Sequence, residues 1–214
     1  MSSKRKLSAA EWVPASHDLK KLRSAAPNCR GCELYERATQ VVFGEGPQDA
    51  KVVMVGEQPG DEEDRRGHPF IGPAGRLLSK AMQEAGLDRD KIYVTNAVKH
   101  FKWVERGKRR IHAKPNGMEI SACKPWLEAE LASIAPELVV CLGATAAQSL
   151  MGNAFRITKE RGHFFPHPWA KLLVATIHPS AILRVPDRYE EEYGLFVHDL
   201  KLVADKIHEF DLAS

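Results

Sequence analysis

Residues 51–60 read Lys-Val-Val-Met-Val-Gly-Glu-Gln-Pro-Gly, an apolar run that ends abruptly at a glycine and a carboxylate. Such a run without polar breaks is typical of a strand that is buried on both faces, as in a parallel sheet. We place the first strand at 51–55 and expect similar strands at 92–95, 138–142 and 172–176. These runs predict a central four-stranded parallel sheet.

Helical patterns separate the four apolar runs. We expect helices at 17–25, 74–85, 117–134, 145–151 and 189–210. Strands that alternate with helices through short connections predict a single three-layer α/β/α domain, with helices on both faces of the sheet. This domain is expected to span residues 16–210, after a flexible basic lead-in at 1–15.

The composition is that of an ordinary globular domain, with 43% hydrophobic and 28% charged residues. The net charge is only +3, but basic residues gather at 4–6 and at 106–110, which favours a polyanionic partner. No apolar stretch approaches the roughly 20 residues of a membrane span, so we expect a cytoplasmic protein without a membrane partner. No heptad or apolar interface stripe remains outside the expected core, which favours a monomer.

The four cysteines are better explained as metal ligands or core residues than as disulfides, because cytosolic thiols stay reduced. Cys29 and Cys32 form a C-x-x-C pair, and Cys123 lies in an expected helix. Cys141 lies inside an apolar strand, where a free cysteine usually acts as a small buried hydrophobe. A histidine could complete the set, and His100 follows the second strand most closely. Structural zinc on three cysteines and one histidine, or a histidine that only packs, remain open alternatives.

Polar residues follow each expected strand at the point where it ends. They are residues 56–60, Asn96, Gly143 and residues 178–180. The carboxyl ends of parallel strands meet at one edge of a sheet, and open α/β sheets bind ligands there. The sequence therefore predicts one pocket at this edge.

Four motifs taken together resemble the family 4 uracil-DNA glycosylases. They are residues 56–60, 69–75 (Pro-Phe-Ile-Gly-Pro-Ala-Gly), 95–99 (Thr-Asn-Ala-Val-Lys) and 178–181 (His-Pro-Ser-Ala). Their order and spacing match over roughly residues 27–205, which implies a uracil-DNA glycosylase-like fold and a substrate of uracil-containing DNA, single-stranded or duplex. The resemblance also implies a 4Fe–4S cluster on Cys29, Cys32, Cys123 and the residue at position 100. That position is His100 instead of the family's cysteine, so we expect ligation by three cysteines and one histidine.

Residues 106–112 are similar to the loop that distinguishes the UdgX branch of this superfamily, and Gln58 stands where family 4 usually has alanine. The likeness implies that His112 attacks C1′ of the sugar after uracil leaves, oriented by Arg110 and Glu57. A histidine held against the sugar would compete effectively with water. Lys108, Arg109, Arg110 and Ser180 are expected to support the loop and the DNA. An incidental histidine in a phosphate-binding loop is the alternative.

The resemblance also implies roles in base recognition and in departure of the leaving group. Phe70 would stack on an extruded base, and the amide of Asn96 would read the edge that distinguishes uracil from cytosine. His178 would stabilise negative charge at uracil O2, while Glu57 would face the sugar. Gly56, Gln58 and Asp61 are expected to complete the uracil pocket, although residues 61–64 could also form a solvated loop.

Three other functions share some of these features. A conventional glycosylase would release uracil and turn over repeatedly, and a uracil-DNA binding module would recognise the base without cleaving it. An enzyme that acts on small nucleotides could also use the strand-end glycine loops.

Overall fold

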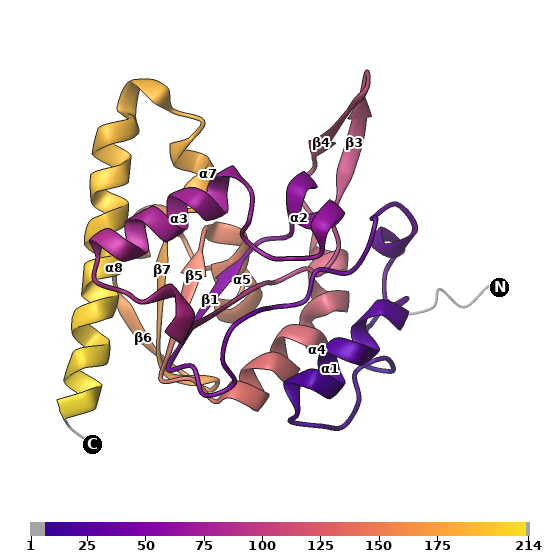
Figure 1. Ribbon diagram of the computed structural model, residues 1–214, viewed down its shortest axis with the longest axis horizontal. Helices are drawn as coiled ribbons and strands as arrows, with labels where there is room; N and C mark the ends of the chain where they lie inside the picture. The colour runs from indigo at the N-terminus through magenta and orange to yellow at the C-terminus, as the bar shows by residue number, and fades with distance from the viewer. Residues whose placement is uncertain (1–6, 213–214) are drawn as a thin grey trace.

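The computed structural model describes residues 7–212, which fold around a five-stranded sheet (Figure 1). The strands follow the order β2-β1-β5-β7-β6. The first four in that order are parallel and correspond to the predicted strands: β2 is Ile92–Asn96, β1 is Val52–Gly56, β5 is Leu138–Leu142 and β7 is Ala170–Thr176.

The sheet has five strands, one more than the four predicted from the sequence. The additional strand, β6 (Phe164–His167), pairs antiparallel to β7 at the edge of the sheet. It is only partly buried and contains Pro166, so it lacks the apolar run that marks a central strand.

The predicted helices are confirmed to within two residues at each end. The α-helices are α1 (Leu19–Ala25), α2 (Asp61–Arg66), α3 (Pro73–Glu84), α4 (Gly117–Ile134), α5 (Ala144–Met151), α6 (Ile157–Glu160), α7 (Pro179–Ile182) and α8 (Tyr189–Leu212). Short 3₁₀ turns lie at Ala26–Asn28, Glu33–Glu36, Arg89–Lys91 and Pro186–Arg188. No helix in residues 7–212 is both long and apolar enough to cross a membrane.

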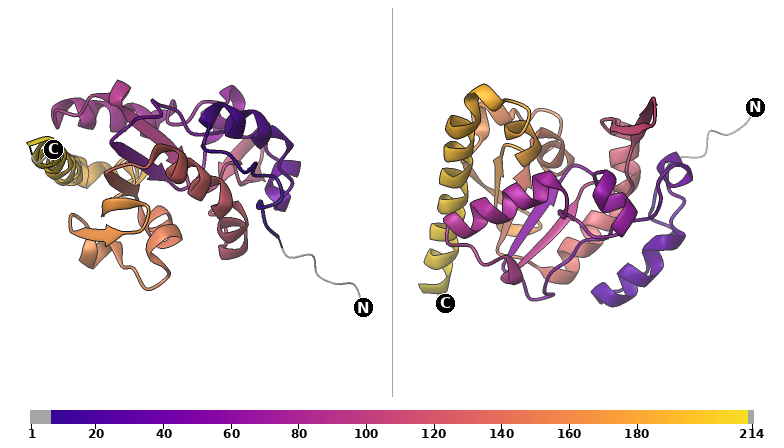
Figure 2. Two further views of the ribbon diagram at one scale, coloured as in Figure 1. Left: turned by 90° about the horizontal axis from the view of Figure 1, so that it is seen from below. Right: turned by 45° about the horizontal axis from the view of Figure 1, so that its top comes forward.

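Helices lie on both faces of the sheet (Figure 2). The sheet therefore separates two hydrophobic clusters. Val53 and Val55 of β1 pack with residues of α1, α4 and α5 on one face. Val52 and Met54 pack with residues of α3 and α8 on the other face. This alternation is the period of two expected for a strand, and burial on both sides explains its continuous apolar sequence.

Two segments that carry polar residues differ from the expectation of loops. Residues 61–64 form the first turn of α2, because the Glu63 carboxylate accepts a hydrogen bond from the Gly60 N–H at 3.1 Å and stabilises that turn. Asp64 in this turn is fully buried. Residues 103–112 form a hairpin of β3 (Trp103–Arg106) and β4 (Arg109–His112) that projects from the domain (Figure 1).

The expected lead-in at 1–15 lies partly outside the described residues, which begin at residue 7. Ala9 is 1% exposed, and its N–H donates to the carbonyl of Ala122 in α4 at 2.7 Å. The chain therefore packs on the domain well before residue 16.

Candidate active site

A cavity of about 860 Å³ lies at the carboxyl ends of the parallel strands. The predicted site residues that line it are Glu57, Gln58, Asp61, Phe70, Asn96, His112, His178 and Ser180. This is the pocket predicted from the polar strand ends, and its volume suits a nucleotide-sized ligand.

Gly56 allows Asn96 and Phe70 to lie close together at the floor of the cavity. A Cβ atom on Gly56 would lie 2.4 Å from Asn96 Oδ1 and 2.7 Å from Phe70 Cζ. Phe70 has a φ of +57°, a left-handed conformation that is strained for a residue with a side chain. Gly75 accommodates this turn, because a Cβ atom there would lie 1.7 Å from the Phe70 carbonyl oxygen. Both glycines are therefore required by the position of the aromatic ring.

His178 is a neutral hydrogen-bond donor in this cavity. Burial lowers its pKa to about 4, against the opposing effect of the Glu57 charge. The Ser180 N–H donates to His178 Nδ1 at 3.1 Å, so the ring proton is on Nε2. The imidazole lies 6.5 Å from the Phe70 ring, centroid to centroid, with 30° between the planes. An N–H donor thus lies beside a stacking surface.

Glu57 lies between His112 and Thr145. Its Oε1 is 3.2 Å from His112 Nε2, and its Oε2 accepts a hydrogen bond from the Thr145 hydroxyl. Burial by itself would raise the pKa of Glu57, but the hydrogen bonds from His112 and Thr145 outweigh it and lower the pKa. Glu57 is therefore a charged carboxylate that lies against the half-exposed imidazole of His112.

Gln58 lines the cavity, but its amide is bonded to the base of the hairpin. Its Nε2 donates to the carbonyls of Lys102 at 3.2 Å and Ala113 at 3.1 Å, and its Oε1 accepts from the Lys102 N–H at 3.1 Å. These bonds join the two ends of the segment that carries His112. The Gln58 amide is thus bonded to the hairpin, while its side chain also lines the cavity in which the contact with uracil is predicted.

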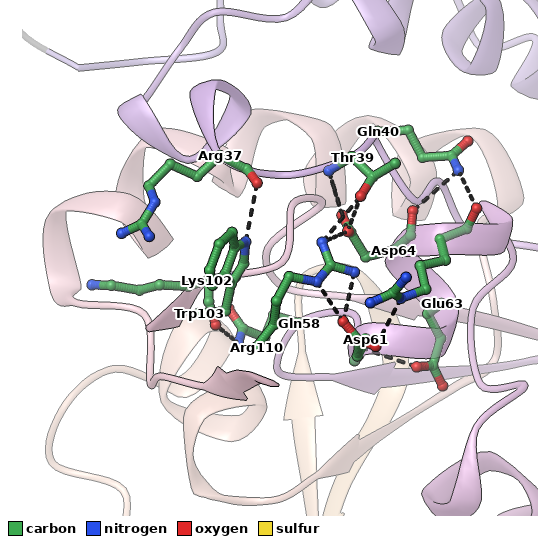
Figure 3. A network of polar contacts seen from close by, with 12 residues as sticks. Arg37, Thr39, Gln40, Gln58, Asp61, Glu63, Asp64, Lys102, Trp103 and Arg110 are labelled. Atoms are coloured by element: carbon green, nitrogen blue, oxygen red, sulfur yellow. Dashed lines mark hydrogen bonds and ion pairs between the residues drawn. The ribbon is translucent and has the colours of Figure 1, made fainter. Parts of the chain in front are cut away.

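Arg110 turns inward and connects β4 to α2 (Figure 3). Its Nε donates to Asp61 Oδ1 at 2.6 Å, and its Nη1 donates to Asp64 Oδ2 at 2.7 Å and to Thr39 Oγ1 at 3.1 Å. The side chain is only 16% exposed, so most of its surface is used in these contacts. Arg110 and Asp61 thus hold the hairpin, whereas Lys108 and Arg109 are exposed near its tip.

The predicted metal ligands line a second, small cavity together with Trp126: Cys29, Cys32, His100 and Cys123. Cys123 is placed by α4, which begins with reciprocal hydrogen bonds between Asn116 and Glu119. Backbone N–H groups approach two sulfurs, from Gly31 to Cys29 Sγ at 3.5 Å and from Lys99 to Cys123 Sγ at 3.3 Å.

Burial raises the pKa of Cys123 to about 12 and lowers that of His100 to about 4, so both groups are neutral at pH 7. A metal ion would favour the thiolate that burial alone disfavours. Across residues 7–212, however, no group of three or more His, Cys, Asp or Glu side chains has the arrangement of a metal site. Cys141 is fully buried in β5, as expected for a core residue.

Two residues that contact the site, Thr145 and Thr39, are not among the residues predicted from the sequence. Thr145 had a usable signal, because it follows the glycine that ends the third strand. Thr39 carries no signal in the sequence, because it lies in a segment without hydrophobic periodicity. Its N–H donates to Asp64 Oδ1 at 2.9 Å, and the two residues are 25 positions apart in the chain.

The chain belongs to the uracil DNA glycosylase superfamily, whose family model matches residues 43–201. It is 40% identical over 176 residues to a type-4 uracil-DNA glycosylase of Thermotoga maritima, a match that covers 81% of this chain and 86% of the relative. A type-4 uracil-DNA glycosylase of Sulfurisphaera tokodaii is 36% identical, covering 79% of this chain and 77% of the relative. A type-5 enzyme of Thermus thermophilus is 30% identical over 65% of this chain and 68% of the relative. These matches confirm the superfamily and the resemblance to type-4 enzymes.

Proposed function

We propose that this protein excises uracil from DNA and then joins His112 covalently to C1′ of the abasic sugar. The type-4 glycosylase names of its relatives support the first step. The observation that carries the second is His112 Nε2 at 3.2 Å from the Glu57 carboxylate, on the wall of the cavity that Asn96 and Phe70 line.

Recognition uses Phe70 and Asn96. The nucleotide must leave the base stack to reach a cavity of this kind, and the Phe70 ring then replaces part of the lost stacking. The Asn96 amide donates to uracil O4 and accepts from N3–H. Cytosine presents the opposite pattern, so each unsatisfied buried group costs on the order of 1–3 kcal/mol.

Cleavage uses His178 and Glu57. As the C1′–N1 bond breaks, both bonding electrons leave with uracil, and its negative charge at O2 accepts a hydrogen bond from His178 Nε2–H. One donor of this type is worth about 3 kcal/mol of transition-state stabilisation. The charged Glu57 carboxylate stabilises the positive charge that develops on the sugar.

Capture uses His112. The lone pair of the imidazole forms an N–C1′ bond, and the ring then carries a positive charge. Glu57 accepts the proton from the other ring nitrogen and passes it through solvent to the uracil anion. The products are neutral uracil and a histidine-linked abasic site.

The test is to incubate the protein with uracil-containing and undamaged oligonucleotides, and to measure free uracil and a denaturation-resistant protein–DNA adduct. We expect both products in equal amounts with uracil DNA alone. Repeated turnover without an adduct would indicate a conventional glycosylase. Binding without uracil release would indicate a recognition module.

We also propose that Cys29, Cys32, His100 and Cys123 hold a 4Fe–4S cluster. Their shared cavity supports this, as does Trp126, whose indole N–H is fully buried and has no hydrogen-bond partner among the described protein atoms. An N–H donor beside a cluster would bond to its sulfur atoms. When bound, the cluster would supply cross-links between the N-terminal segment, β2 and α4. The purified protein should contain iron and acid-labile sulfide, whereas zinc without either would contradict the proposal.

A further inference from the structure

A buried cation, Lys99, lies behind the active-site cavity. Its side chain is 1% exposed and forms an ion pair with Glu130, which is fully buried. The same ammonium donates to Thr95 Oγ1 at 2.6 Å and to the backbone carbonyl of Asn96 at 2.8 Å. Lys99 therefore contacts the residue that faces the base without itself lining the cavity.

Stability alone does not explain this pair. A buried ion pair loses so much hydration that apolar residues of similar volume often serve the fold equally well. The contact with Asn96 is the informative one. Lys99 Nζ bonds the carbonyl of the Asn96–Ala97 peptide group, while the Ala97 N–H donates to the Gly56 carbonyl at 2.9 Å. Both polar groups of this peptide are thus bonded, which holds the backbone that directs the Asn96 side chain.

The other contacts of the pair extend to α4. Glu130 also accepts hydrogen bonds from Tyr93 Oη at 2.9 Å and from the Gly44 N–H at 3.0 Å. The backbone N–H of Lys99 donates to Cys123 Sγ, on the same helix as Glu130. The helix that carries a candidate cluster ligand is therefore bonded to the strand end that carries the candidate base reader.

We propose that Lys99 is a positioning residue for base recognition, which holds the Asn96 peptide so that the side-chain amide selects uracil over cytosine. This inference rests on the proposed function. The Asn96 side chain has little room to move towards Gly56, because a methyl group on Gly56 would lie 2.4 Å from Asn96 Oδ1. Loss of the Lys99 contact allows the peptide to rotate, and the amide then no longer distinguishes the two bases.

The test compares affinities for oligonucleotides that carry 2′-fluoro-deoxyuridine or 2′-fluoro-deoxycytidine, which bind but resist cleavage. Lys99→Met/Glu130→Gln removes both charges and leaves no unpaired buried ion. Lys99→Arg keeps the charge but spreads its donors over three nitrogens, so it does not make the three contacts that one ammonium makes. Tyr93→Phe is the matched control, since it removes a hydrogen bond to Glu130 but retains the ion pair and the contact between Lys99 and Asn96. Thermal unfolding is measured for every variant.

We expect the uracil-to-cytosine affinity ratio to fall at least tenfold in both Lys99 variants and to stay within threefold of wild type in Tyr93→Phe. If the double variant does not fold, the affinity ratio of Lys99→Arg provides the test. A lower melting temperature with an unchanged affinity ratio would show that Lys99 is merely structural, and the inference would be wrong. Failure of the proposed function is distinguishable, because wild-type protein would then release no uracil and would not prefer uracil in this assay.

Discussion

Arg110 holds the hairpin in place, so its replacement should separate covalent capture from uracil release. Arg110→Ala removes hydrogen bonds to Asp61, Asp64 and Thr39 and leaves the fully buried Asp64 carboxylate without its cation. Hydrogen bonds to charged groups contribute about 1.5–3 kcal/mol each, and part of this is recovered by water in the variant. A net loss of about 3 kcal/mol would lower the equilibrium constant for hairpin docking by roughly 100-fold, and the population with His112 in place would fall by up to the same factor.

The assay is single-turnover kinetics at saturating uracil-containing DNA, with free uracil and adduct measured in the same samples. We expect uracil release by Arg110→Ala to stay within about threefold of wild type, while adduct formation slows by roughly 100-fold. Arg106→Ala is the matched control, because Arg106 is an exposed arginine on the same hairpin. Equal slowing of both steps, or an unchanged adduct rate, would refute the idea that Arg110 acts by holding His112.

Three further predictions concern the cavity. His112→Ser should abolish the adduct and admit water, giving multiple turnovers of uracil release; a persistent adduct on denaturing gels would place the nucleophile elsewhere. Asn96→Asp should reduce the preference for uracil over cytosine by at least tenfold, since the donor to O4 is lost; binding assays with both bases would detect an unchanged preference. Because burial lowers the pKa of His178 to about 4, the unfolded state takes up a proton near pH 6.5 that the folded state does not bind. The free energy of unfolding should therefore fall as the pH drops from 6.5 towards 4, by about 2 kcal/mol already at pH 5. Urea denaturation at pH 7 and 5 should show this decrease in the free energy of unfolding in wild type and in His163→Gln, an exposed-site control. His178→Gln should lack it. Equal pH dependence in all three proteins would contradict the buried neutral imidazole.

Much of the fold and the position of the site could be read from the sequence. The parallel strands β1, β2 and β5 are buried along their whole length and β7 is buried over its last four residues, so each contains a continuous apolar run. The polar residues that follow these runs had to converge at one edge, since parallel strands end together. This convergence predicts that Asn96, Glu57 and His178 lie around one cavity, and all three line it in the structure.

Only the tertiary structure decided which polar side chains face the cavity and which hold the hairpin. Gln58 bonds Lys102 and Ala113, 44 and 55 residues away along the chain, and Arg110 reaches Asp61 across 49 residues. Such partners leave no trace in hydrophobic periodicity, which records burial but not the identity of a hydrogen-bond partner. The edge strand β6 and the hairpin were missed for a related reason, because partly exposed strands carry no continuous apolar run. The sequence by itself therefore determined the sheet and its functional edge, whereas the orientation of each side chain at that edge depended on contacts between distant segments.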